Sequence, residues 1–166
     1  PSNLVAGSAL DIDENLASGI VITQFSATDN DFNATLTFSL FDDNGSTHNS
    51  LFAIAADGTL SSAAVLDHEE NATRIVRVKV TDDKNASIDQ LFTVTVNNLN
   101  ETPSIGYAGG GNSGTVSVGE NQRNIGSFTA SDPDGDVLTY SIIGGTDNGN
   151  VVIDSVSGEL SFVNVP

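Results

Sequence analysis

Acidic and amide side chains gather in short segments that lie far apart in the sequence. Several of the acidic pairs are two positions apart, so a turning loop can direct both side chains into one concave site. Hard cations such as calcium bind about six to eight oxygen atoms from carboxylates, amides, backbone and water. This spacing indicates a cation site assembled from several loops. The segments are Glu14/Asn15, Asp29/Asp31, Asp67/Glu69, Asn98/Asn100/Glu101 and Asp132/Asp134.

The charge balance narrows the classes of partner. The formal net charge is −17, from 22 acidic residues against 5 Lys and Arg. Such a field repels phosphate, which argues against nucleic acid and anionic membranes and attracts divalent cations instead. An acidic surface that serves only solubility is the alternative that charge alone leaves open. The chain has no cysteine, so disulfides and thiolate metal sites are excluded. No apolar run approaches the roughly 20 residues that cross a bilayer, and we expect no membrane insertion.

Apolar and polar residues alternate along much of the chain. The pattern is clearest in residues 36–40, 75–80 and 92–96, and turn-forming Asp, Asn and Gly residues lie between such runs. Period-two alternation predicts β-strands with one buried face, and helix is expected only as a stray turn. The number and spacing of the strands predict an antiparallel β-sandwich. We expect about seven strands, near residues 4–10, 19–28, 34–41, 51–55, 59–64, 73–81 and 87–97.

An internal repeat divides the chain. Four motifs return in the same order about 100 residues later, and the offset drifts only as changes in loop length would produce. The sequence therefore predicts two tandem domains of one fold. The pairs are Glu14-Asn15 with Glu120-Asn121, Asp29-Asn-Asp31 with Asp132-Pro-Asp134, Leu36-Thr-Phe-Ser-Leu40 with Leu138-Thr-Tyr-Ser-Ile142, and Gly58-Thr-Leu60 with Gly158-Glu-Leu160.

The two predicted domains differ in length. Residues 1–101 form a complete repeat, and residues 102–166 form the first part of a second repeat that lacks about two strands. The second domain should therefore expose sheet edges, which favour pairing with other strands. Whether another chain supplies the missing strands is left open by the sequence. Pro103 biases Thr102 toward extended backbone, so residues 98–103 should form a nearly straight connector.

These motifs together resemble cadherin-type repeats, in the form common on bacterial surface and secreted adhesins. The resemblance covers the whole chain, and its specificity lies in the order and repeat length rather than in any single motif. The matching segments are Asp13-Glu14-Asn15 with Gly19, Thr28-Asp-Asn-Asp31, Leu66-Asp-His-Glu69, Val80-Thr-Asp82, residues 98–103, Glu120-Asn121 and Asp132-Pro-Asp-Gly-Asp136.

The resemblance implies an all-β fold of tandem immunoglobulin-like, antiparallel Greek-key sandwiches, with calcium bound between successive repeats. Asn98 and Glu101 both stand where the family usually has Asp, so one charge is lost and one side chain is longer. Asp29, Asp31 and Asp82 would form a weaker, partial site toward an upstream repeat, with ordinary turn chemistry as the alternative. The ligands implied for the site between repeats are Glu14, Asp67, Glu69, Asn98, Asn100, Glu101, Asp132 and Asp134.

The expected function is a calcium-binding structural and adhesion module of an extracellular protein, in which Ca²⁺ stiffens the connector between repeats. Expected partners are calcium, adjacent repeats of the same protein and a like repeat on another cell. A polysaccharide-binding or homophilic recognition module is the alternative. Paired carboxylates also occur in glycosidases. With two Tyr and no Trp to bind sugar rings, we expect no enzyme here.

Overall fold

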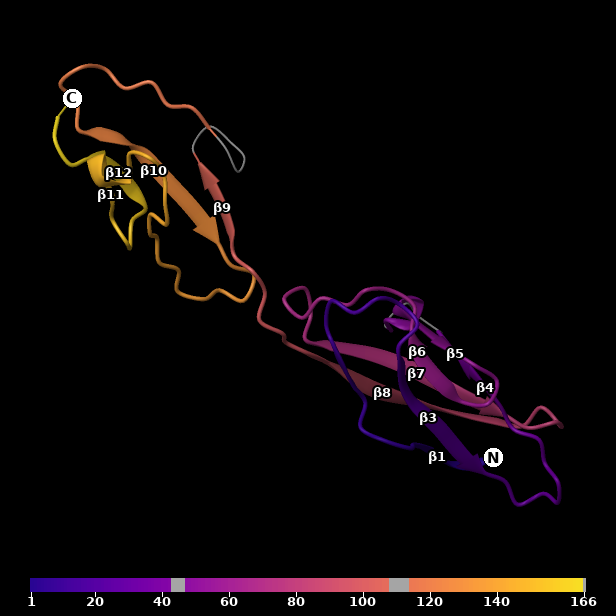
Figure 1. Cartoon of the computed structure of the whole chain (residues 1–166). Helices are drawn as coiled ribbons and strands as arrows, with labels where there is room; N and C mark the ends of the chain where they lie inside the picture. Colours follow the sequence, from indigo (N-terminus) through magenta and orange to yellow (C-terminus); the bar gives the residue numbers. More distant parts are fainter. Residues whose placement is uncertain (43–46, 108–113, 166) are drawn as a thin grey trace. The chain divides into compact units, whose positions relative to one another are not determined.

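The computed structural model describes residues 1–42, 47–107 and 114–165. The chain forms two compact units, Pro1–Leu99 and Asn100–Pro166, and this boundary lies two residues before the one predicted for the repeats. Strands and two short 3-10 turns make up the regular structure of the described residues (Figure 1). None of the described residues belongs to a helix with the length and apolar character to cross a bilayer.

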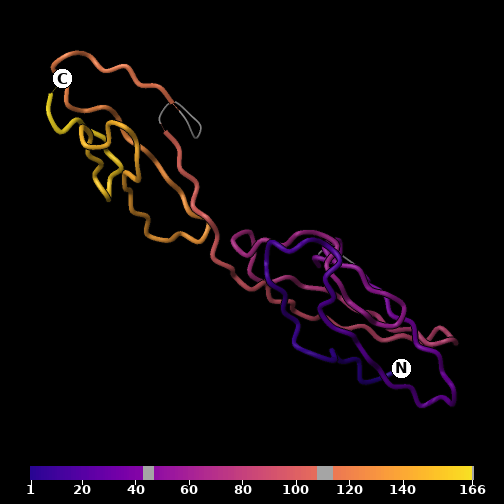
Figure 2. Tube along the Cα trace, in the orientation of Figure 1, coloured from indigo at the N-terminus to yellow at the C-terminus, as the bar shows by residue number. Residues whose placement is uncertain are grey.

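The first unit contains two four-stranded sheets. In each, one face carries the buried residues, as the alternation predicts. The Cα trace shows the indigo N-terminal segment beside the segment that forms β3, with which it pairs (Figure 2). The 3-10 turn η1 (Asn49–Leu51) leads directly into β5. One sheet has the order β1 (Ser2–Ala6), β3 (Val21–Thr28), β6 (Thr59–Ser62), β5 (Phe52–Ile54), and the other β2 (Asp11–Asp13), β8 (Ser87–Asn97), β7 (Thr73–Thr81), β4 (Thr37–Leu40).

The core of the first unit lies between these sheets. Strand β7 alternates strictly, and its inward positions hold Val76, Val78 and Val80, which are fully buried. Phe25 from β3 packs against Phe92 from β8 with ring centroids 4.7 Å apart. The apolar side chains of both sheets therefore form one sandwich core, which confirms the predicted fold class.

Two details of the strand prediction are wrong. The expected first strand, residues 4–10, is β1 (Ser2–Ala6) followed by a separate strand β2 (Asp11–Asp13), which makes eight strands. Strand β2 pairs with β8 in parallel, so the sandwich is not wholly antiparallel. The Asn97 side-chain amide donates to the carboxylates of Asp11 and Asp13, at 3.2 and 3.0 Å. A three-residue strand held by such a distant partner leaves almost no periodic signal.

The second unit repeats one sheet of the first. Its order, β9-β10-β12-β11, corresponds to β1-β3-β6-β5. A 3-10 turn precedes β11, as one precedes β5 in the first unit. The Phe25 N–H donates to the Gly58 carbonyl at 2.8 Å, and the Phe128 N–H to the Gly158 carbonyl at 2.9 Å. The elements are β9 (Ser104–Tyr107), β10 (Asn124–Ser131), η2 (Asn148–Asn150), β11 (Val151–Ile153) and β12 (Glu159–Phe162).

One face of the second unit lacks a covering sheet among the residues described. Residues 138–142, the counterpart of β4, form no strand there, and no described segment of this unit corresponds to β7 and β8. An open hollow of about 570 Å³ lies on this face, lined by Phe128, Tyr140, Ile142 and Leu160 among others. None of the described apolar side chains of this unit is fully buried, and some, such as Ile143, are almost fully exposed.

Candidate metal centre

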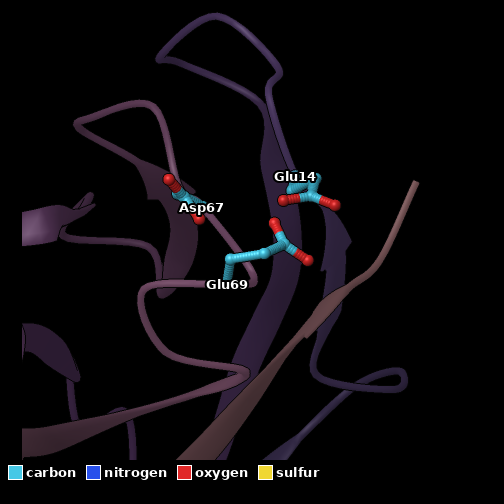
Figure 3. A group of neighbouring side chains, drawn as sticks. All are labelled: Glu14, Asp67 and Glu69. Atoms are coloured by element: carbon cyan, nitrogen blue, oxygen red, sulfur yellow. The ribbon is translucent and has the colours of Figure 1, made fainter. Parts of the chain in front are cut away.

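Three carboxylates meet at one end of the first unit. Glu14 follows β2 directly, whereas Asp67 and Glu69 lie in the loop between β6 and β7. Each offers an oxygen within 4.8 Å of an oxygen of the other two. Figure 3 shows the carboxylates of Glu14 and Glu69 pointing toward one another, with Asp67 beside them. The structure therefore brings together three of the residues that the resemblance implied as ligands.

Glu14 is fully buried, and two backbone N–H donors stabilise its ionised carboxylate. The His68 N–H donates to one carboxylate oxygen and the Leu99 N–H to the other, each at 2.7 Å. These two hydrogen bonds, the His68 bond foremost, lower the pKa of Glu14 from its ordinary value, whereas burial opposes them. Glu14 consequently stays ionised in the interior at neutral pH.

The loop that carries Asp67 and Glu69 is internally braced. One Asp67 carboxylate oxygen accepts the Glu70 N–H at 2.9 Å, and the Asp67 carbonyl accepts the Asn71 N–H at 3.3 Å. Glu69 accepts a hydrogen bond from the Asn98 side-chain amide at 3.3 Å. The start of the connector is thus tied to the carboxylate cluster within the first unit.

The acidic pair Asp132 and Asp134 lies in the loop that follows β10. Asp134 accepts the backbone N–H of Glu101 at 2.7 Å, and the Asn100 side chain donates to the Glu101 carbonyl at 3.1 Å. The Asp132 carbonyl accepts the Gly135 N–H at 3.2 Å. Asp134 is therefore held near the connector residues of its own unit. That the two sets of ligands share ions stays a prediction.

The expected upstream group, Asp29, Asp31 and Asp82, also has carboxylate oxygens within 4.8 Å of one another. A cation within the chain already contacts it. The Lys84 ammonium lies 2.9 Å from Asp31. The Asp82 carboxylate accepts the N–H groups of Lys84 and Ala86, which is ordinary turn chemistry. The Asp82 contacts fit the turn alternative, and the partial metal site stays a prediction.

Sequence reasoning missed the groups that support the cluster. The N–H donors of His68 and Leu99 belong to the backbone, so the types of the side chains do not reveal them. Arg74 was missed as well, although a signal existed: it stands in phase with Val76, Val78 and Val80, at an inward position of β7. A charged residue in that register is unusual, because buried charges require partners.

The donor set suits a hard cation. Glu14, Asp67 and Glu69 offer only oxygen, which calcium prefers over softer ligands. The His68 imidazole, whose Nδ1 lies 2.7 Å from the Val96 carbonyl oxygen, is not part of this group of neighbouring ligand atoms. Calcium bound here would supply positive charge that offsets the repulsion among the three carboxylates.

Comparisons with known proteins agree with this architecture. No protein-family profile matches the chain. The chain is similar to human Protocadherin Fat 1, with 26% identity over 172 residues, which covers 95% of this chain and 4% of that protein. It thus spans only a small part of the curated relative it matches.

Solved structures resemble the chain over nearly its whole length. Human Protocadherin-24 EC1-2 gives a TM-score of 0.70 at 20% identity, covering 98% of this chain and 76% of that one. The Protocadherin GammaB4 extracellular domain gives 0.59 at 20% identity, covering 98% of this chain and 29% of that one. The chain therefore has the immunoglobulin-like fold of cadherin repeats.

Proposed function

We propose that this chain is a calcium-binding structural and adhesion module of an extracellular protein built from many such repeats. Calcium bound at the connector stiffens the join between repeats, and the module is not catalytic. The parent protein in this proposal is a bacterial surface or secreted adhesin, and the other partners are adjacent repeats and a like repeat on another cell. The proposed ligands are Glu14, Asp67, Glu69, Asn98, Asn100, Glu101, Asp132 and Asp134.

One observation carries the proposal: Glu14, Asp67 and Glu69 present oxygens within 4.8 Å of one another, with Glu14 buried and held ionised. Like charges this close repel by about 1–3 kcal/mol per pair at an intermediate dielectric. A divalent cation offsets that repulsion. The proposed extracellular setting is supported by the cadherin fold and by similarity to the Protocadherin GammaB4 extracellular domain. Polysaccharide binding gains no such support, and we do not propose it.

Titration calorimetry of CaCl₂ into the 166-residue chain tests the proposal. We expect saturable binding with a dissociation constant of about 10⁻⁴–10⁻³ M, as in extracellular calcium modules. Calcium that binds only the folded chain stabilises it by about 2.7 kcal/mol at 100 times the dissociation constant. The melting temperature should therefore rise in calcium relative to chelator. Equal melting temperatures and no heat of binding would contradict the proposal.

Matched variants separate specific ligation from loss of charge. Asp134→Asn removes one negative charge from a proposed ligand. Asp147→Asn removes one from an exposed residue of the same unit whose side chain makes no cap hydrogen bond to η2. We expect Asp134→Asn to weaken calcium binding and Asp147→Asn to leave it unchanged. An equal loss in both would mean that calcium responds only to overall charge.

A further inference from the structure

A charged side chain lies buried against the loop that carries Asp67 and Glu69. Arg74 is 2% exposed and occupies an inward position of β7, next in register to Val76. A guanidinium stays protonated in any protein environment, so its charge is buried with it. Such burial is costly unless hydrogen bonds and opposite charges satisfy the group.

The Arg74 guanidinium donates three hydrogen bonds to the loop that carries Asp67 and Glu69. Nη1 donates to the Asn71 carbonyl at 2.6 Å, and Nη2 donates to the Asp67 carbonyl at 3.3 Å and to the Glu70 carboxylate at 3.0 Å. The acceptors span residues 67–71, with Asp67 and Glu69 inside that span. One planar guanidinium thus contacts both ends of residues 67–71 and the side chain of Glu70.

The backbone contacts matter more than the ion pair. The Glu70 side chain is 76% exposed, so its pairing with Arg74 is screened by water and contributes little. The two carbonyl acceptors, by contrast, fix the backbone from which the Asp67 and Glu69 side chains extend. Lysine cannot reproduce this arrangement, because its single ammonium lacks the fork that spans two separated acceptors.

We propose that Arg74 is a positioning residue for the cation site: it holds residues 67–71 in the binding conformation before any cation arrives. This inference rests on the proposed calcium function. A loop that is already ordered pays no ordering cost on binding, so its affinity is higher than that of a mobile loop. Simple electrostatics predicts the opposite effect, because a nearby positive charge repels Ca²⁺. Removing Arg74 should therefore weaken calcium binding if its ordering of the loop dominates, and strengthen calcium binding if its repulsion of Ca²⁺ dominates.

Calorimetric titration of the full chain with CaCl₂ distinguishes them. We expect Arg74→Met to weaken calcium binding about tenfold or more, as loss of partners that orient metal ligands typically does. Arg74→Lys, which keeps the charge without the fork, should fall between the wild type and Arg74→Met. Tighter binding by Arg74→Met would show that repulsion dominates and would overturn the proposal.

Arg77→Met is the matched control. Arg77 lies on the same strand, and its side chain pairs with Asp89 at 3.2 Å, on the neighbouring strand β8. This variant should keep the wild-type calcium affinity even if its melting temperature falls. Unchanged affinity in Arg74→Met, with equal losses of melting temperature in calcium and chelator, would make Arg74 a core residue only and refute its positioning role.

Hydrogen exchange in chelator provides a readout that does not depend on calcium. The Glu70 and Asn71 amides, which donate within the loop to Asp67, should exchange faster in Arg74→Met than in the wild type or Arg77→Met. If the wild type binds no calcium, the proposed function fails, and this measurement still decides whether Arg74 orders the loop. If Arg74→Met does not fold, Arg74→Lys decides by the same two measurements.

Discussion

At the scale of single residues, the carboxylates of the two acidic groups in the first unit are stabilised by different partners. Glu14 relies on backbone N–H donors, whereas Asp31 relies on the ammonium of Lys84. Backbone dipoles leave the full charge of the carboxylate available to a cation, whereas the Lys84 ammonium competes with a cation for Asp31. The Glu14 group is therefore the stronger candidate for calcium.

Glu14→Gln tests this difference. The amide keeps one oxygen acceptor, but its NH₂ group then faces the second N–H donor, so that donor loses its partner. We expect calcium affinity to fall at least about tenfold. Asp31→Asn, changed in the other group, should alter calcium affinity less, and calorimetry compares the two. A larger effect from Asp31→Asn would reverse the ranking of the groups.

Asp57 makes a pH-dependent contribution to stability. Its carboxylate accepts the Thr59 N–H at 3.0 Å, which lowers the pKa of Asp57 from its ordinary value of 3.8. A lowered pKa in the folded state means that the stabilisation is complete above the unfolded value and is lost as pH falls through the folded value.

Asp57→Asn should therefore be less stable than the wild type at pH 7, and the difference should shrink steadily below about pH 4. Urea unfolding at pH 7, 4 and 2.5 measures both chains. A difference that stays constant across this range would mean that the carboxylate's charge plays no part in the turn.

At the scale of elements, the repeat is visible as equivalent close contacts. Gly58 and Gly158 both have positive φ, at 91° and 72°, and a Cβ on either would lie 2.5 Å from the carbonyl oxygen of Phe25 or Phe128 respectively. Each glycine lets a turn approach the middle of a strand, which places β6 against β3 and β12 against β10. The motif Gly-x-Leu is thus repeated because the packing requires it.

Gly58→Ala should destabilise the first unit by about 2 kcal/mol or more, because it adds a steric clash to the strain of a left-handed residue. Gly19→Ala is the matched control: Gly19 has φ of 97°, and a Cβ there would contact nothing within 4 Å. This control isolates the backbone strain alone. Chemical unfolding of both variants measures the difference, and equal losses would contradict the predicted clash.

At the scale of the whole molecule, the two units differ in how well they bury apolar surface. The fully buried apolar core of the described residues lies entirely in the first unit, including Leu60, Val76 and Val94. The described part of the second unit presents the open hollow beside Tyr140 and Ile142 instead. Exposed apolar faces favour association with other surfaces.

The full chain should therefore bind the dye ANS in its native state, and residues 1–99 alone should bind much less. The first unit has its own core and should fold by itself. Fluorescence titration compares equal molar amounts of the two chains. Equal dye binding would indicate that the open face of the second unit is not accessible in solution.

Much of the architecture could be predicted from the local pattern of the sequence. Alternation in residues 75–80 predicted β7, and the return of Gly58-Thr-Leu60 as Gly158-Glu-Leu160 predicted the tandem organisation. These features depend on neighbouring residues and on repetition, both of which can be read along the chain. The acidic pairs likewise indicated which residues to examine for metal binding.

Tertiary structure alone decided how the candidate site is supported. The N–H groups that hold Glu14 belong to His68 and Leu99, which are 54 and 85 positions away in the sequence. The parallel pairing of β2 with β8 and the contacts of Arg74 with its loop depend equally on packing. Backbone donors have the same chemistry at every residue, so only the folded chain determines which of them meet a given carboxylate.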